Sequence, residues 1–140
     1  DDTCLATGEL LPVKDTPFDF NKMKKIGQDI EEDHIQLKNA FGYDHSFVLK
    51  GEERQLTLEE PVSGRRLVIS TTAPVVQVYT GNFLKDGCIG KAGRVYENRE
   101  GVALETQLMP NAINTEKNPS TILRKGDKFE SNTKYVFEIM

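Results

Sequence analysis

The chain has 140 residues, of which 37% are hydrophobic and 29% charged, a composition typical of one folded domain rather than a disordered chain. The formal net charge is -4 and no dense basic run is present, so a nucleic-acid partner is not expected. No apolar stretch approaches the roughly 20 residues of a membrane helix, and residues 1–10 lack the basic region and apolar core of a signal peptide. We therefore expect one cytoplasmic domain over residues 1–140, without a membrane partner.

Two cysteines, Cys4 and Cys88, are present. With no sign of secretion, free thiols are expected rather than a disulfide. The sequence contains no CxxC motif and no His/Cys cluster, so it predicts no metal site.

Residues 20–39 form the zone with helical periodicity. Met23, Ile26 and Ile30 recur at helical spacing, but Gly27 interrupts them. Because glycine in a helix interior costs about 1 kcal/mol relative to alanine, we expect one or two short helices or turns here.

After Gly42 the pattern changes to short strands separated by turn signals. Apolar runs, some of them alternating, predict strands over 45–51, 54–61, 66–72, 75–81, 101–109, 120–127 and 134–140. A long glycine-punctuated loop connects Gly81 to Gly101, and such loops are usually functional or mobile. Short strands at this spacing predict an all-β, sandwich-like fold.

The strand over 101–109 carries a carboxylate, Glu105, between Leu104 and Thr106. By alternation the even-numbered residues share one face, and the odd-numbered residues, including Gln107, share the other. Glu105 therefore either points to solvent on a polar face or lies in a pocket and does chemistry. The alternation pattern alone does not choose between these two interpretations.

Asp44 and His45 stand at the start of the first strand, just after Gly42. Asp is common at strand ends, so one interpretation is a turn-capping Asp beside a surface or satisfied His. Strand neighbours point to opposite faces, so the pair does not define a catalytic triad. No Gly-x-Ser-x-Gly motif indicates a nucleophile. His34, in the helical zone, is expected at the surface.

Gln77 shares a strand face with Val75 and Tyr79. If it is buried on this largely apolar face, its amide needs a hydrogen-bond partner. The alternative is a surface-facing glutamine on an edge strand.

Four motifs, in this order, resemble the galactose mutarotase (aldose 1-epimerase) family: TGELLPVKDTPFDF, GYDHSFVL, VVQVYTGNF, and LETQLMPNAIN followed by PSTILRKGD. The resemblance covers nearly the whole chain. It implies a large antiparallel β-supersandwich, of which this chain looks like the C-terminal half. It also implies interconversion of the α and β anomers of hexoses such as galactose or glucose, without a cofactor.

The resemblance implies roles for three residues. The glutamate of the family's L-E-T-Q motif is the catalytic base and matches Glu105. The aspartate of its G-x-D-H motif binds sugar hydroxyls and matches Asp44, and the glutamine of its Q-x-Y-T-G-N strand lines the site and matches Gln77. On this resemblance, Glu105 faces a pocket.

The chain departs from the family pattern in one large respect. The family's general acid is a histidine in an N-H-x-Y-F-N-type motif, which this sequence lacks, and neither His34 nor His45 matches it. Three hypotheses follow: an epimerase half, inactive alone, that works with an N-terminal half in trans; a non-catalytic carbohydrate-binding β-sandwich; and a structural or interaction remnant. A half-sandwich exposes sheet edges and apolar surface, so a homodimer is also expected.

Overall fold

The computed structural model describes residues 3, 5–51, 55–85, 89–116 and 121–140. Within these ranges the chain is nearly all β. The elements in chain order are α1 (Ile35–Ala40), β1 (Asp44–Val48), β2 (Leu56–Glu60), β3 (Arg65–Thr71), β4 (Val75–Tyr79), β5 (Ala103–Gln107), the 3₁₀ helix η1 (Ala112–Asn114) and β6 (Thr133–Ile139). No helix in the described ranges has the length and apolar character needed to cross a membrane.

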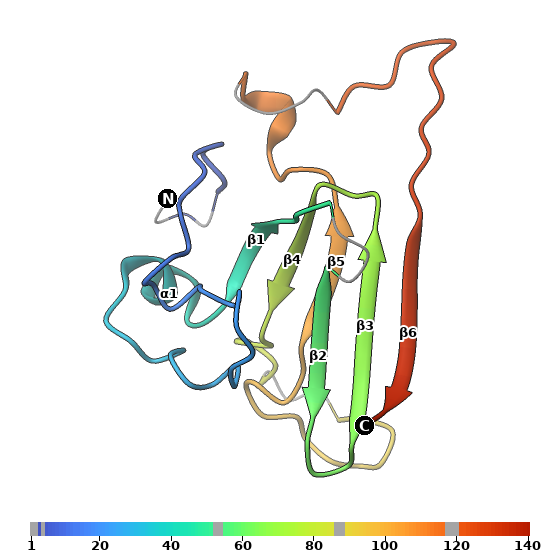
Figure 1. Cartoon of the computed structure of the whole chain (residues 1–140). Helices are drawn as coiled ribbons and strands as arrows, with labels where there is room; N and C mark the ends of the chain where they lie inside the picture. Colours follow the sequence, from blue (N-terminus) through green and yellow to red (C-terminus); the bar gives the residue numbers. More distant parts are fainter. Residues whose placement is uncertain (1–2, 4, 52–54, 86–88, 117–120) are drawn as a thin grey trace.

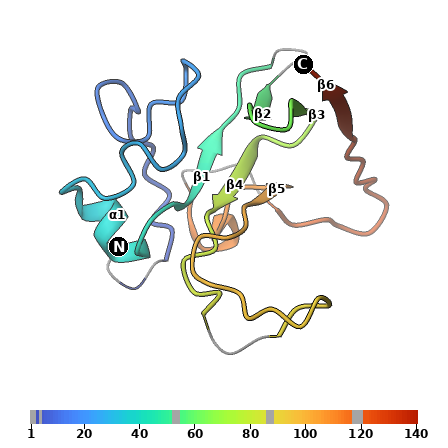
Figure 2. The same cartoon turned by 90° about the horizontal axis from the view of Figure 1, so that it is seen from below.

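Two three-stranded antiparallel sheets make up the fold (Figure 1). Sheet A has the strand order β1–β4–β5, and sheet B has the order β2–β3–β6. The N-terminal segment and α1 lie on the β1 side of sheet A, away from β6 (Figure 2). This arrangement confirms the all-β, antiparallel fold class that the sequence and its family resemblance predicted.

The hairpin between β2 and β3 shows how the sequence sets sheet B. Leucine, valine, isoleucine and threonine supply most positions of the two strands, as suits a half-buried pleated surface. In the turn between them, the Glu60 carboxylate accepts hydrogen bonds from the N–H groups of Val62 (2.9 Å) and Ser63 (2.7 Å). Gly64 closes the turn with a φ of 70°, which side-chain-bearing residues rarely adopt.

Threonine hydroxyls link the two sheets. Thr133 of β6 hydrogen-bonds through Oγ1 to the Oγ1 of Thr106 in β5 (2.9 Å) and to the Oγ1 of Thr71 in β3 (2.8 Å). Just beside them, the Thr72 N–H donates to the Asn132 carbonyl and the Asn132 N–H donates to Thr72 Oγ1, both at 2.9 Å. The start of β6 is therefore a point where sheet B is fastened to sheet A.

The helical zone expected over 20–39 folds mostly as turns, with α1 at its end. His34 caps the helix: its Nδ1 accepts the N–H of Gln36 at 3.2 Å, and its ring packs edge-on against Phe18 with centroids 5.2 Å apart. The side chain is half-buried, so it is less exposed than the sequence suggested. The helix ends at Ala40, and the C-cap residue Phe41 has a left-handed backbone.

A small aromatic and aliphatic core joins the N-terminal segment to sheet A. The buried members of this core are Phe18, Ile30, Leu37 and Tyr43, and Val13, Phe20, Ile26 and Phe47 pack partly buried around them. Most of these residues precede β1, so the core attaches the turns of the N-terminal segment to the first strand of the sheet.

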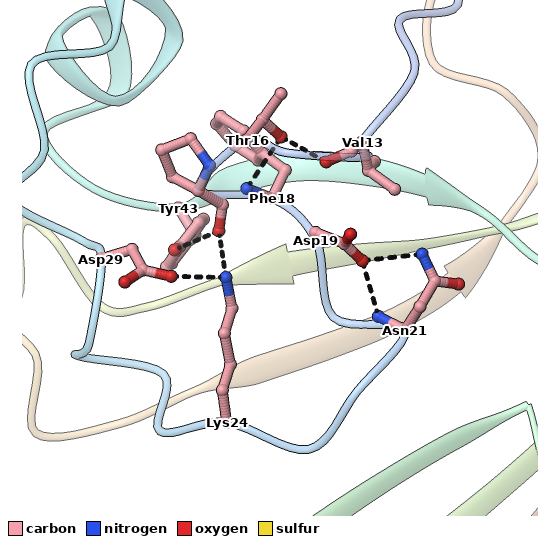
Figure 3. Close-up of polar contacts among 9 residues, drawn as sticks. Val13, Thr16, Phe18, Asp19, Asn21, Lys24, Asp29 and Tyr43 are labelled. Carbon is pink, nitrogen blue, oxygen red and sulfur yellow. Dashed lines mark hydrogen bonds and ion pairs between the residues drawn. The ribbon is translucent and has the colours of Figure 1, made fainter.

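Tyr43 is the residue of this core that comes directly before β1, and its side chain is fully buried. Its hydroxyl donates a hydrogen bond to the Pro17 carbonyl at 2.8 Å. The Lys24 Nζ donates to the same carbonyl at 2.7 Å and forms an ion pair with Asp29 at 2.6 Å (Figure 3). Burial raises the pKa of Tyr43 to about 12, so the hydroxyl remains a neutral donor at ordinary pH. This network fixes the backbone one residue before Asp44.

The backbone at Tyr43 is held from its other side by the segment after β4. The Tyr43 carbonyl accepts hydrogen bonds from the Thr80 N–H and from Asn82 Nδ2, both at 3.0 Å. Gly42 has a φ of 137°, and a Cβ atom there would lie 2.5 Å from Asn82 Oδ1. Glycine is therefore required at this approach, which sets the entry of β1.

The prediction of a strand over 120–127 is wrong for the described residues 121–127. Residues 121–127 contain no strand. Asp127 instead closes a turn, because its N–H donates to the Arg124 carbonyl (3.0 Å) and its carboxylate accepts the Arg124 N–H (2.9 Å). Ile122 and Leu123, which suggested a strand, are more than half exposed. Neither sheet of the described chain pairs with this segment.

The cysteines lie outside the described residues, so the expectation of free thiols stays a prediction.

Candidate functional site

Polar side chains form a row across sheet A. The register pairs Ser46 of β1 with Gln77 of β4, and Gln77 with Glu105 of β5. Asp44 lies two residues before Ser46, so strand alternation puts it on the same face. The fold thus brings the three site residues predicted from the sequence, Asp44, Gln77 and Glu105, to one face of one sheet.

Gln77 is hydrogen-bonded at both ends of its side-chain amide. Its Nε2 donates to Asp44 Oδ1 (2.6 Å), and its Oε1 accepts from Ser46 Oγ. Since β4 is the central strand of sheet A, the edge-strand alternative for Gln77 is wrong. The hydrogen bond between Gln77 and Asp44 also gives the Asp44 carboxylate a partner, which is a side chain of the neighbouring strand β4.

A cavity of about 370 Å³ opens on this face, a volume within the range of small-molecule sites. Its lining residues are Asp44, Gln77, Tyr79, Phe83, Glu105, Gln107 and Pro110. All three strands of sheet A contribute to it. Phe83 and Pro110, from the segments that follow β4 and β5, add apolar atoms to a lining that is otherwise largely polar.

Glu105 is exposed and lines this cavity. The carboxylate therefore reaches solvent and lies in a cavity at the same time, so its exposure does not exclude a chemical role. No ion pair joins Glu105 to another described residue. The carboxylate oxygens are therefore accessible to a molecule in the cavity.

His45 points to the opposite side of the sheet from Asp44, as alternation predicts. Its ring packs edge-on against Phe18, with centroids 4.7 Å apart, and its Nδ1 accepts the Asp44 N–H at 3.0 Å. Burial lowers the pKa of His45, and the nearby Asp44 carboxylate only partly opposes this shift. His45 is thus a satisfied, neutral histidine at neutral pH, and neither it nor His34 lines the cavity.

Phe83 brings the start of the long loop between β4 and β5 to the cavity. Its N–H donates to Tyr79 Oη at 3.1 Å, and its ring packs edge-on against Phe41, with centroids 5.5 Å apart. The Phe83 side chain is 55% exposed, so its ring is accessible to a ligand. The loop that the sequence marked as functional or mobile therefore contributes to the site.

Four cavity residues were not predicted from the sequence: Tyr79, Phe83, Gln107 and Pro110. Tyr79 and Gln107 could have been found, because they share strand faces with the predicted site residues. Phe83 and Pro110 lie outside the strands, so strand periodicity gave no signal for them.

The arrangement suits a polyhydroxylated ligand. In the part of the chain that the structure describes, no group of three His, Cys, Asp or Glu side chains is placed to hold a metal ion. The cavity instead offers one accessible carboxylate, a carboxylate–amide pair and a further amide. Such groups can hold hydroxyls by directed hydrogen bonds and accept a proton from one of them.

The family model for aldose 1-epimerase matches residues 1–136. The chain therefore belongs to the aldose 1-epimerase family, as its motifs predicted. It is 40% identical to galactose mutarotase from Sus scrofa and 38% identical to galactose mutarotase from Homo sapiens, in both cases over 99% of this chain and 40% of the relative. It is 34% identical to aldose 1-epimerase from Escherichia coli K12, over 91% of this chain and 38% of the relative.

Two solved structures share the fold. An aldose epimerase homologue from C. elegans matches with a TM-score of 0.86 at 32% identity, over 99% of this chain and 42% of that chain. Galactose 1-epimerase from Lactobacillus acidophilus matches with a TM-score of 0.75 at 26% identity, over 99% of this chain and 40% of that chain. The chain thus spans about 40% of the length of the relatives it matches.

Proposed function

We propose that this chain is the C-terminal part of a mutarotase that interconverts the α and β anomers of hexoses such as galactose or glucose. In the proposal Glu105 is the catalytic base, and Asp44 and Gln77 bind sugar hydroxyls. The observation that carries it is the shared cavity, since these side chains come from three strands and line one hollow. Family membership supports the reaction type, and relatives named galactose mutarotase support galactose as a substrate.

The residues suit the chemistry of mutarotation. A base takes the proton from the anomeric C1 hydroxyl, and an acid protonates the ring oxygen as the C1–O5 bond breaks. The open aldehyde rotates about C1–C2, the ring closes on the other face, and both protons return. The exposed Glu105 carboxylate can perform the first step, and general acid–base catalysis typically contributes about 10²–10⁴-fold. No step needs a cofactor.

We propose that the general acid comes from a second segment. His34 caps α1 and His45 accepts a backbone N–H, so both ring Nδ1 atoms are already engaged. We therefore propose that the chain is inactive alone and that an N-terminal half in trans supplies the general acid. The 140 residues would then form one partial galactose-mutarotase-like domain working in the cytoplasm.

The exposed apolar face of β6 supports such a partner. Tyr135, Phe137 and Ile139 alternate along this edge strand and are 47%, 79% and 78% exposed. Edge strands with exposed apolar side chains favour association. A homodimer and an N-terminal half are the two partners that the proposal allows at this surface.

A non-catalytic carbohydrate-binding module is the second candidate. The observation in its favour is the Gln77–Asp44 hydrogen bond, a ready polar pair that does not depend on a general acid. This candidate predicts sugar binding without turnover, even with an N-terminal half present. A structural remnant predicts neither binding nor turnover.

Polarimetry tests these alternatives directly. Freshly dissolved α-D-galactose would be followed to anomeric equilibrium with the chain alone, with the chain plus the N-terminal part of a galactose mutarotase relative, and with Glu105→Gln in both mixtures. We expect acceleration only in the complemented wild-type mixture. Sugar binding without acceleration in any mixture would favour the binding module, and the absence of both would favour the remnant. Acceleration that persists in Glu105→Gln would remove Glu105 from the base role.

A further inference from the structure

Ser46 hydrogen-bonds to Gln77 beside the cavity, and it lines an adjoining hollow together with Asp44 and Gln77. It is half-buried in β1 and lies directly opposite Gln77 in the register. We propose that Ser46 is a positioning residue that fixes the side-chain amide of Gln77 with its Nε2 toward Asp44 and its Oε1 toward Ser46. The inference rests on the proposed function of the same cavity and extends it to Ser46, which acts by holding Gln77.

The direction of the hydrogen bonds follows from the chemistry of the three groups. An ionised carboxylate only accepts hydrogen bonds, so Gln77 must present its NH₂ end to Asp44 Oδ1. The amide oxygen then faces Ser46 and only accepts, so the Ser46 hydroxyl must donate. A flipped amide would place its oxygen against the carboxylate oxygen, where neither atom can donate. The bonds therefore run in one direction, from Ser46 through Gln77 to Asp44.

The consequence for a ligand is a fixed pattern of donors and acceptors. With the amide held at both ends, Gln77 keeps one free Nε2–H, and Asp44 keeps its second carboxylate oxygen beside it. A donor next to an acceptor matches two adjacent hydroxyl groups of a sugar. Without the Ser46 bond the Gln77 amide would be held at one end only, by Asp44, and the ligand would have to order the other end, which weakens binding.

Two substitutions of nearly equal shape separate the effect of the Ser46 hydroxyl from that of side-chain size. Ser46→Thr keeps a hydroxyl donor, whereas Ser46→Val has the same branched shape without it, and both suit a β-strand. The Gln77 side-chain amide signals in ¹⁵N–¹H spectra, assigned by their loss in Gln77→Leu, report its orientation in the sugar-free protein. Titration with galactose reports affinity, and thermal melting of both variants shows that the fold is retained.

We expect the Gln77 amide signals to keep their position in Ser46→Thr and to move toward those of a free glutamine in Ser46→Val. Galactose affinity should fall about 3- to 10-fold in Ser46→Val relative to Ser46→Thr, the effect of one hydrogen bond. Unchanged amide signals in Ser46→Val would overturn the inference, and so would equal galactose affinity in the two variants. If neither the wild-type chain nor its mixture with an N-terminal half binds sugar, the proposed function fails, and the amide signals alone decide whether Ser46 orients Gln77.

Discussion

Gln77 and Glu105 are directly opposite residues of neighbouring strands, and both line the same cavity. Directly opposite residues of antiparallel strands have their Cβ atoms about 4.5–5.5 Å apart. A sugar hydroxyl held by Gln77 therefore brings the rest of the ring within reach of the Glu105 carboxylate. In our proposal the first residue binds and the second reacts, so substitutions should separate the two roles.

Glu105→Gln should remove turnover and leave binding nearly intact. The amide has almost the same shape as the carboxylate but cannot take the C1 proton, so we expect the rate of the complemented enzyme to fall about 10²–10⁴-fold. Polarimetry gives the rate, and galactose titration gives the affinity, which should change little. A variant that loses affinity as strongly as rate would show that Glu105 mainly binds the sugar.

Gln77→Leu should weaken binding while Glu105 remains in place. The substitution keeps the side-chain bulk and removes the hydrogen bonds to Asp44 and Ser46. It also removes the Nε2–H that the proposal gives to a sugar hydroxyl, so we expect galactose affinity to fall about 3- to 10-fold, the effect of one hydrogen bond. Calorimetric titration measures the loss. Wild-type affinity in this variant would exclude Gln77 from the binding site.

The positions of most strands could be predicted from sequence because their signal is local. Apolar alternation and turn residues placed β1 to β6 within a few residues, and the hairpin turn after Glu60 was marked by proline and glycine. The segment with Ile122 and Leu123 failed because an apolar run forms a strand only where a neighbouring strand pairs with it. Pairing is a tertiary property, and the run alone does not contain it.

The site was predictable only in part for the same reason. Periodicity gave the faces of the strands that carry Gln77 and Glu105, but not which faces meet a cavity. The family resemblance supplied that choice. Alternation puts Ser46 on the face of Asp44, but its bond to Gln77 depends on the register with β4. Phe83 had no local signal, because its position depends on the course of a loop.

The stability of the chain should fall with acidification through His45. Burial lowers the pKa of His45 in the folded state, so the unfolded chain binds the proton more readily. The stabilisation is present above the unfolded pKa near 6.5 and is lost as pH falls toward the folded value. The slope from this one group is at most about 1.4 kcal/mol per pH unit.

Urea unfolding of the wild type and of His45→Phe, measured at pH 7 and pH 5, tests this linkage. Phenylalanine keeps an aromatic ring against Phe18 and has no titrating nitrogen. We expect the free energy of unfolding to drop more between the two pH values in the wild type. An equal drop in both proteins would assign the pH dependence to other groups.

Tyr43→Phe should destabilise the chain by about 0.5–1.5 kcal/mol, the net value of one hydrogen bond. The loss stays modest because the Pro17 carbonyl keeps its bond from Lys24. Thermal or urea unfolding measures it. The matched control is Tyr96→Phe at a tyrosine that is 43% exposed, where we expect almost no change. A comparable cost at both positions would mean that the buried hydroxyl adds nothing specific.

The apolar face of β6 should drive self-association of the isolated chain. Phe137 is 79% exposed on this edge strand, so Phe137→Lys should weaken a dimer at least ~10-fold by placing a charge on it. Val62→Lys is the matched control, since Val62 is 94% exposed in the turn after β2. Light scattering across a concentration series measures both. A wild-type chain that stays monomeric at high concentration contradicts the prediction.

The anchoring of Tyr43 makes the chain unevenly tolerant of inserted residues. Tyr43 is held by the Pro17 carbonyl on one side and by Thr80 on the other. Its fixed position sets which side chains of β1 face the cavity. One extra residue directly after Tyr43 would shift β1 by one position. Asp44 would then face away from the cavity, and the side chain of the inserted residue would face it. The same insertion in the exposed turn over 61–64 would only lengthen a loop. Length changes in this chain should therefore be accepted at the turn and rejected at the entry of β1.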